Sequence, residues 1–280
     1  MVAWFAAHGR DLPWRAPGTD PWAVLVCEVM SHQTPVARVV PVWLRWLTRW
    51  PDASALADDS PGEAVRMWGR LGYPRRALRL HETAVAVRDG HGGVVPGTYE
   101  ELLALPGVGP YTAGAVAAFG FGRRAVVLDV NVRRVLARVH DGADPTAAAP
   151  TVGERARAEA LLPVEASTSV AWNAAVMELG ALVCTARAPR CPECPLQADC
   201  AWAADPPPAR SRTTRRQPWH GTDRQVRGRI MALLRASHGL VEEATLLAVC
   251  DDPAQARRCL DSLAVDGLAE RADDGVRLPL

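Results

Sequence analysis

Four of the chain's seven cysteines lie within 17 residues, with six, two and five residues between them: Cys184, Cys191, Cys194 and Cys200. Cysteine thiolates bind zinc and iron–sulfur clusters, and a cubic cluster takes one cysteine per iron. Zinc ribbons usually use two close pairs separated by a long loop, whereas only Cys191 and Cys194 form a close pair here. The spacing therefore favours a 4Fe-4S cluster over zinc, with a chance structural cluster as the remaining alternative.

Two carboxylates stand beside apolar sequence. Glu28 lies within "DPWAVLVCEVMS", where the pattern predicts a helix over 21–31. If Glu28 faces inward, desolvation raises its pKa and suits it to act as a general acid, whereas on a polar face it is an ordinary exposed side chain. Asp129 separates an apolar run from a helix predicted over 130–139. An aspartate in that position is either a helix N-cap or a second catalytic carboxylate.

A glycine-rich turn occurs in "LPGVGPYTAGAVAAFG", residues 105–120. Gly107 and Gly109 lie between two predicted helices, where unpaired N–H groups at the start of the second helix favour a phosphate oxygen. This pattern is typical of a helix-hairpin-helix, which holds DNA without reading its sequence. The alternative is a plain turn between packed helices.

The elements that must position these residues are mainly helices. Helical periodicity predicts an all-α body up to residue 205, with these helices: 21–31, 35–49, 61–70, 75–89, 109–120, 130–139, 152–161 and 169–183. A Pro/Arg-rich linker is predicted over 206–224. Residues 225–280 then predict a winged-helix-like domain, with helices over 225–236, 242–249 and 253–265 and two short strands around an Asp-Gly turn.

Composition excludes several classes of protein. The chain has 280 residues, of which 49% are hydrophobic and 22% charged, and its formal net charge is +1. No apolar run approaches the roughly 18 residues of a membrane span, and the N-terminus lacks the pattern of a signal peptide. A cytoplasmic, nucleoid-associated protein with reduced thiols is expected. All 32 basic residues are arginine, which excludes a lysine nucleophile.

The motifs occur in a familiar order: "LPWR" at 12–15, "EVMSHQT" at 28–34, "GYPRRA" at 72–77, "LPGVGPYTAGA" at 105–115, "LDVNVRRV" at 128–135, then the four cysteines. This series resembles the endonuclease III superfamily of helix-hairpin-helix DNA glycosylases, and within it is most similar to the MutY-type adenine glycosylases. The resemblance covers residues 1–205. It implies two helical lobes with a DNA-facing cleft, a 4Fe-4S loop over 184–200, and a monomer that acts on double-stranded DNA carrying a mismatch or lesion.

The resemblance also implies catalytic roles. Glu28 would protonate adenine N7 and assist the attacking water, and Asp129 would stabilise the cationic sugar. Tyr111 and Asn131 match positions that support these two carboxylates. The expected reaction is hydrolysis of the N-glycosidic bond of adenine mispaired with 8-oxoguanine or guanine, in base excision repair. Bifunctional relatives have a lysine where Tyr111 stands, so a monofunctional enzyme without lysine-dependent lyase activity is expected.

Other positions are assigned to DNA by the same resemblance. Gln33 matches the residue that fills the space of the flipped base, and Trp14 lies in a motif that approaches the base pocket, with Arg15 beside it to contact phosphate. Arg187 and Arg190 of the cysteine loop would be presented to phosphates.

Several features depart from the pattern of the adenine glycosylases. Ser31 and His32 stand where the family usually has leucine and glutamine, Val130 replaces glycine, and Pro74 replaces a second tyrosine. The residues after the linker do not have the strand-rich pattern of the usual Nudix-like C-terminal domain, so a short form of the family is expected. Two alternatives therefore stay open: a glycosylase for a different mispaired or damaged base, and a non-catalytic DNA-binding or iron–sulfur redox protein.

Overall fold

The computed structural model describes residues 1–205 and 220–280, and the fold is mainly α-helical, as the periodicity predicted. The contacts divide the chain into two compact units, each formed from segments distant in sequence. The described residues of the first unit are 1–28 and 95–205, and those of the second are 29–94 and 220–280. The predicted linker, 206–224, lies mostly outside the described residues. Within the described part of the chain, no helix is both long and apolar enough to cross a bilayer.

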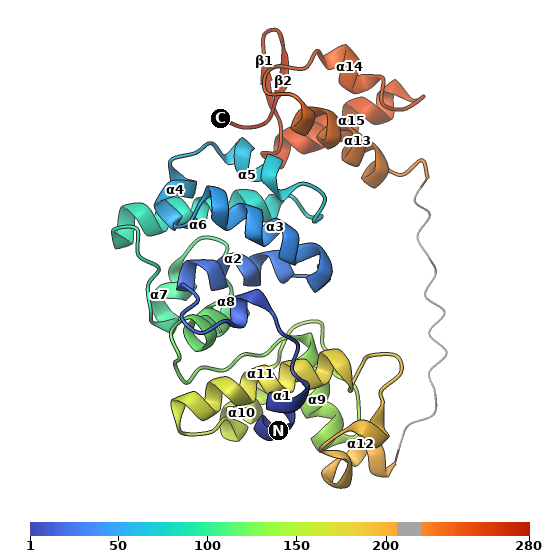
Figure 1. Ribbon diagram of the computed structural model, residues 1–280. Helices are drawn as coiled ribbons and strands as arrows, with labels where there is room; N and C mark the ends of the chain where they lie inside the picture. The colour runs from blue at the N-terminus through green and yellow to red at the C-terminus, as the bar shows by residue number, and fades with distance from the viewer. Residues whose placement is uncertain (206–219) are drawn as a thin grey trace. The chain divides into compact units, whose positions relative to one another are not determined.

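The first unit is built around the pair α9 (Val130–Asp141) and α11 (Ala166–Leu182), which pack against each other, with α1 (Val2–His8) on α11 (Figure 1). A buried apolar cluster that includes Val132, Val135, Val176 and Leu179 joins them. The helices of this unit are α1 (Val2–His8), α2 (Pro21–Ser31, whose last three residues belong to the second unit), α7 (Tyr99–Ala104), α8 (Pro110–Ala115), α9 (Val130–Asp141), α10 (Val152–Leu161), α11 (Ala166–Leu182) and α12 (Ala201–Ala204).

Short turns of other helix types complete this unit. Two 3-10 turns, Cys191–Glu193 and Gln197–Asp199, belong to the cysteine loop, and a third, Pro13–Arg15, carries the "LPWR" motif. The helix predicted over 109–120 is divided: α8 ends at Ala115 and a π-helical turn follows over Val116–Gly120. Gly114 packs its Cα against the carbonyl of Val126, where no Cβ would fit. Local periodicity alone does not reveal that packing, and it predicted one continuous helix.

The second unit contains a tryptophan core. Trp46 packs edge-on against Trp50 and Trp68, with ring centroids 4.6 and 5.9 Å apart. All three rings are buried, so these tryptophans serve packing. The helices around them are α3 (Val36–Arg49), α4 (Ala53–Ala57), α5 (Pro61–Trp68) and α6 (Arg75–His91).

Residues 220–280, called the C-terminal segment below, follow the predicted order of three helices and a hairpin (Figure 1). They are α13 (Asp223–Ala236), α14 (Glu243–Leu247), α15 (Pro253–Val265), β1 (Glu270–Ala272) and β2 (Gly275–Arg277). The strands are antiparallel, with Arg271 opposite Val276, and Val241 bridges to Val276 from outside the hairpin. The segment belongs to the same compact unit as residues 29–94.

Candidate active site and cysteine loop

Glu28 is the buried carboxylate of α2. Its neighbours Leu25, Val26 and Cys27 are at most 2% exposed, and Glu28 itself is 7% exposed. The alternative of an exposed polar face is therefore wrong. A carboxylate in such apolar surroundings is desolvated, which disfavours its charged form.

Tyr111 lies at the start of α8 and donates its hydroxyl hydrogen to Oε2 of Glu28 at 2.6 Å. Burial and the negative charge of Glu28 raise the pKa of Tyr111 well above its usual value. The phenol therefore stays protonated at physiological pH and acts as a donor. This contact joins residues 83 positions apart in the sequence.

The pKa of Glu28 is raised to about 7. Burial is the largest cause, and the charge of Asp129 raises it further, whereas the hydrogen bond from Tyr111 and the charge of Arg15 lower it. A carboxyl group with this pKa holds a proton for part of the time near neutrality and can both donate and accept one, as general acid–base catalysis requires.

Asp129 is both an N-cap and a half-buried carboxylate whose charge acts on Glu28, so the two interpretations of its position are compatible. Its Oδ1 accepts hydrogen bonds from the backbone N–H groups of Asn131 and Val132 at 2.9 and 2.7 Å, which caps α9. The side chain of Asn131 donates to Oδ2 at 2.8 Å. Burial raises the pKa of Asp129, although these hydrogen bonds and the charge of Arg134 oppose the shift.

Arg134 links this carboxylate to the cysteine loop. Its guanidinium donates to Oδ1 of Asn131 at 2.7 Å and to the carbonyl of Cys184 at 2.7 Å. Arg134 also donates to the carbonyl of Gly180 at 2.7 Å. Gly180 has no Cβ, which leaves room for the backbone and side chain of Asn131. The side chain that supports Asp129 is thus held by the same arginine as the first cysteine.

The glycine turn joins α7 to α8. Gly107 has a φ of +76°, a left-handed conformation that glycine adopts without strain, and Gly109 is the N-cap residue of α8. The turn directly precedes Tyr111. It therefore positions a residue of the carboxylate site whether or not it also binds phosphate.

Arg15 is held by a carboxylate that the sequence analysis missed. Arg15 donates to Oε2 of Glu178 at 2.8 Å, Arg10 donates to Oε1 at 2.6 Å, and the Arg15 guanidinium lies over the ring of Phe5. Burial alone would raise the pKa of Glu178, but the hydrogen bonds from Arg10 and Arg15 hold it at about 2. A lone glutamate in the apolar run "AVMELGALV" was the available signal. The phosphate contact of Arg15 and the base contact of Trp14 remain predictions.

Ser31, His32 and Gln33 follow Glu28 in sequence but belong to the second unit. Arg76, which the sequence analysis did not select, donates to the carbonyl of His32 at 2.5 Å and to Oγ1 of Thr34 at 3.0 Å. Burial and the charge of Arg76 lower the pKa of His32, so the imidazole is neutral at pH 7.

Gln33 and Tyr73 are the two non-glycine residues with positive φ in the described ranges, at +53° and +48°. Both are exposed, and Arg76 connects the two turns because its guanidinium also lies 5.5 Å from the ring of Tyr73. Such conformations cost about 1–3 kcal/mol and persist where surrounding contacts impose them. No pattern in the sequence reveals a positive φ at Tyr73.

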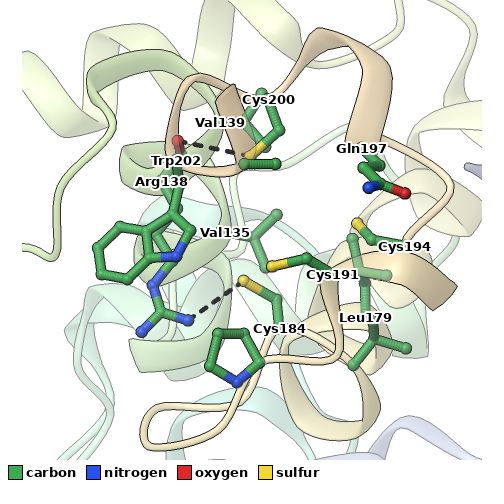
Figure 2. Close-up of a pocket in the computed structure, with 13 residues that line it drawn as sticks. Val135, Arg138, Val139, Leu179, Cys184, Cys191, Cys194, Gln197, Cys200 and Trp202 are labelled. Atoms are coloured by element: carbon green, nitrogen blue, oxygen red, sulfur yellow. Dashed lines mark hydrogen bonds between the residues drawn. The ribbon is translucent and has the colours of Figure 1, made fainter. Parts of the chain in front are cut away.

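All four clustered cysteines line one pocket of the first unit (Figure 2). Its apolar walls include Val135, Leu179 and Val183, and all seven cysteines of the chain are free thiols. Burial is the main cause that raises the pKa of the Cys191 and Cys194 thiols. Among residues 1–205 and 220–280, no three His, Cys, Asp or Glu side chains converge as ligands of a single metal ion.

Arg138 covers one side of the cysteine pocket. This buried arginine donates to Sγ of Cys184 at 3.5 Å and to the carbonyl of Thr185 at 2.8 Å, and its guanidinium lies over the ring of Trp202 at 4.3 Å (Figure 2). A fixed positive charge therefore lies beside the first of the four clustered cysteines.

Comparisons with known proteins agree with this geometry. Residues 26–151 match the family described as HhH-GPD superfamily base excision DNA repair protein. The adenine DNA glycosylase of Mycolicibacterium smegmatis is 50% identical over 277 residues, which cover 98% of this chain and 93% of that protein. The chain belongs to the MutY-type adenine DNA glycosylases.

Some other relatives match a shorter region. The adenine DNA glycosylase of Homo sapiens is 41% identical over 209 residues, which cover 71% of this chain and 38% of the human protein. The structure of a thermostable thymine-DNA glycosylase is similar with a TM-score of 0.65 and 26% identity, covering 72% of this chain and 93% of that one. Among the adenine DNA glycosylases, the similarity to the M. smegmatis protein therefore extends into the C-terminal segment.

Proposed function

We propose that this protein is a DNA glycosylase that hydrolyses the N-glycosidic bond of adenine mispaired with 8-oxoguanine or guanine. The observation that carries the proposal is the pair of carboxylates formed by buried Glu28 and half-buried Asp129, whose charge acts on Glu28, with Tyr111 hydrogen-bonded to Glu28. We infer adenine as the target base from the relatives, because the M. smegmatis and human proteins are both named adenine DNA glycosylases. A protein that only binds DNA has no need of a protonated buried glutamate.

The proposed reaction begins with a proton transfer. Protonated Glu28 gives its proton to N7 of a flipped adenine, and the bond between C1′ of the sugar and N9 breaks with its electron pair going to N9. The sugar becomes an oxocarbenium ion, whose positive charge the Asp129 carboxylate stabilises. Water then attacks C1′, and its proton passes to the Glu28 carboxylate, which restores the starting state.

The enzyme is further proposed to be monofunctional. A Schiff base with the sugar requires an uncharged amine, and the chain has no lysine, with Tyr111 beside Glu28 instead. Incubation with a substrate duplex and sodium borohydride should trap no covalent complex. A stoichiometric trapped adduct that involves a side chain would contradict this proposal.

The cysteine pocket is proposed to hold a 4Fe-4S cluster, with Cys184, Cys191, Cys194 and Cys200 as its ligands. A cubic cluster separates its four ligands, so they need not converge on one point as for a single ion. Four free thiols around an apolar pocket, with Arg138 at Cys184, fit a buried anionic cluster. The cluster would contribute structure, holding the loop whose first cysteine accepts a hydrogen bond from Arg134. Purified protein should contain about four irons per chain and lose them in Cys194→Ser.

Double-stranded DNA is the proposed partner of a monomeric enzyme in the cytoplasm. Gln33 and Tyr73 are proposed to reach the bases, since both are exposed and held in strained conformations by Arg76. Aromatic rings stack on bases of any sequence, which suits a residue that stabilises opened DNA. Gly107 and Gly109 are proposed to contact phosphate.

A second candidate is excision of a mispaired thymine. It is favoured by the similarity to a thymine-DNA glycosylase structure and by the departures Ser31, His32 and Val130, which follow Glu28 and Asp129 closely in the sequence. Val130 is 70% exposed at the first position of α9, directly after Asp129, so its side chain is free to alter what fits there.

One assay separates these functions. Single-turnover reactions use duplexes with A opposite 8-oxoguanine, A opposite G, T opposite G, and A opposite T as a control, followed by alkali to cleave abasic sites. Cleavage at A opposite 8-oxoguanine or G supports the leading proposal, and cleavage at T opposite G supports the second. Binding without cleavage in any duplex would contradict both. Glu28→Gln serves as the inactive control.

A further inference from the structure

The C-terminal segment makes specific contacts with α5 and α6 inside the second unit. Arg66 of α5 donates to the carbonyls of Leu234 and Arg235 at the end of α13, and Arg235 donates from Nε to the carbonyl of Val65 at 3.2 Å. Each arginine thus donates hydrogen bonds to backbone carbonyls in the last turn of the other helix. Carbonyls at a helix C-terminus have no hydrogen-bond donor within their own helix. Burial lowers the pKa of Arg235 to about 10.

Two further contacts join the C-terminal segment to the first turns of α5 and α6. The N–H of Gly62 donates to the carbonyl of Pro279 at 2.8 Å, and a Cβ at Gly62 would lie 2.9 Å from Cβ of Leu278. Arg75, the first residue of α6, pairs with Asp266 at 3.3 Å. The C-terminal segment therefore contacts both helices that flank residues 69–74.

Residues 69–74 form the turn that presents Tyr73, and this turn is tied to α5 and α6. Trp68, the last residue of α5, donates from Nε1 to the carbonyl of Gly72 at 2.9 Å. Arg76 of α6 donates to the same carbonyl at 3.1 Å and lies over the rings of Trp68 and Tyr73. Any change in the spacing of α5 and α6 consequently acts on the backbone of Tyr73.

The charges of the C-terminal segment argue against direct binding to DNA phosphates. It contains eight arginines and ten acidic residues. Five of these arginines are paired with carboxylates of the segment itself: Arg227, Arg257, Arg258, Arg271 and Arg277. A surface of this kind neutralises few phosphates, so it adds little of the electrostatic free energy that dominates DNA binding.

We propose that the C-terminal segment is a brace that positions Tyr73: by holding α5 and α6 through Arg66, Arg235 and Asp266, it maintains the left-handed conformation of the turn. Arg66 and Arg235 are positioning residues, and the segment acts on DNA through Tyr73 instead of by its own phosphate contacts. The activity readout of this inference rests on the proposed function, but its structural readout does not.

The structural test is amide hydrogen exchange of the full-length protein without DNA. Arg66→Ala and Arg235→Met should accelerate exchange in residues 69–76, while exchange in α9 and α11 stays unchanged. Arg66→Lys, which keeps a donor, should restore much of the protection. The matched control is Arg258→Ala, which removes an exposed arginine of the same segment that forms an ion pair with Asp223. Unchanged exchange in residues 69–76 of both interface variants would overturn the proposal, whether or not the protein excises adenine.

The functional test is a double-mutant cycle with Tyr73→Ala. Arg66→Ala should weaken binding to a mismatched duplex by about three- to tenfold, and this loss should disappear in the Tyr73→Ala background, because coupled neighbours are not additive. The dependence of affinity on salt should stay the same, since no phosphate contact is lost. A loss of equal size in both backgrounds, or a shallower salt dependence in Arg258→Ala, would overturn the brace in favour of general destabilisation or of direct DNA contact.

Discussion

The hydroxyl of Tyr111 donates to Oε2 of Glu28 at 2.6 Å, within a buried site where the pKa of Glu28 is about 7. This bond stabilises the carboxylate, so it opposes the effect of burial and keeps the proton of Glu28 available. Tyr111 occupies the position where bifunctional relatives are expected to have a lysine. The residue at this position is thus also the one whose hydrogen bond lowers the pKa of Glu28.

Tyr111→Phe should raise the pKa of Glu28 further, because the bond it removes lowers that pKa. A general acid works in its protonated form, so activity falls as pH rises through its pKa. The falling limb of the pH–rate profile should therefore move to higher pH in Tyr111→Phe. Single-turnover excision between pH 5.5 and about 9 measures this. Tyr99→Phe, the same change in α7, should leave the profile in place, and a shift to lower pH would contradict the assignment.

Glu28→Gln should abolish excision while leaving affinity for the mismatched duplex nearly unchanged. The amide has the shape of the acid but has no proton to give to N7. Excision rate and binding are measured on the same duplex, with Glu82→Gln on the exposed face of α6 as the control. If Glu28→Gln retained a tenth of the wild-type rate, Glu28 would not be the acid.

Asp129→Asn separates catalysis from helix capping. Asparagine is as good an N-cap as aspartate, so the stability of α9 should change little. The excision rate should fall by roughly 100-fold or more, because the sugar cation loses its counter-charge. Asp52→Asn, which makes the same change at the N-cap of α4, should leave the rate unchanged. Equal loss of stability in both variants, with no loss of rate at Asp129, would leave Asp129 as a cap alone.

Arg134→Ala should remove the link between Cys184 and Asn131, because the Arg134 guanidinium donates hydrogen bonds to both residues. Removing groups that orient a site typically costs about 10- to 100-fold in activity. We expect a loss of this size in single-turnover excision while the protein stays folded. Arg157→Ala breaks an exposed ion pair with Asp141 and should have no such effect. Normal excision by the Arg134 variant would show that Asn131 is held without it.

Glu178→Gln should destabilise the first unit in a pH-dependent way. Its pKa is depressed from 4.5 to about 2 in the folded protein, so the carboxylate stabilises the fold above pH 4.5, and this stabilisation is lost as pH falls through 2. Urea unfolding at pH 7 should show a loss of about 2–3 kcal/mol, which shrinks at pH 3. Glu193→Gln, in an exposed pair, should cost less than about 1 kcal/mol at either pH. A pH-independent loss would contradict the role of the charge.

Much of the fold and of the site could be predicted from local sequence patterns. Apolar periodicity indicates where the helices lie, because a helix must present one face to a core at every turn. The same pattern indicated that Glu28 could be buried, because most side chains of the apolar run 21–31 must face the core. Glu28 is indeed buried. Asp129 could be placed at a helix start for the same local reason, because an N-cap is satisfied by N–H groups two and three residues further on.

Contacts between residues far apart in the chain were decided by the tertiary structure alone. Glu178 meets Arg10 across 168 positions, Arg134 meets Cys184 across 50, and Arg66 meets Arg235 across 169. No local pattern encodes such partners, because each depends on how separate helices pack. The left-handed turn at Tyr73 is of the same kind. The sequence by itself determined which residues are capable of the chemistry, and the packing of distant helices decided which partners set their charge and position.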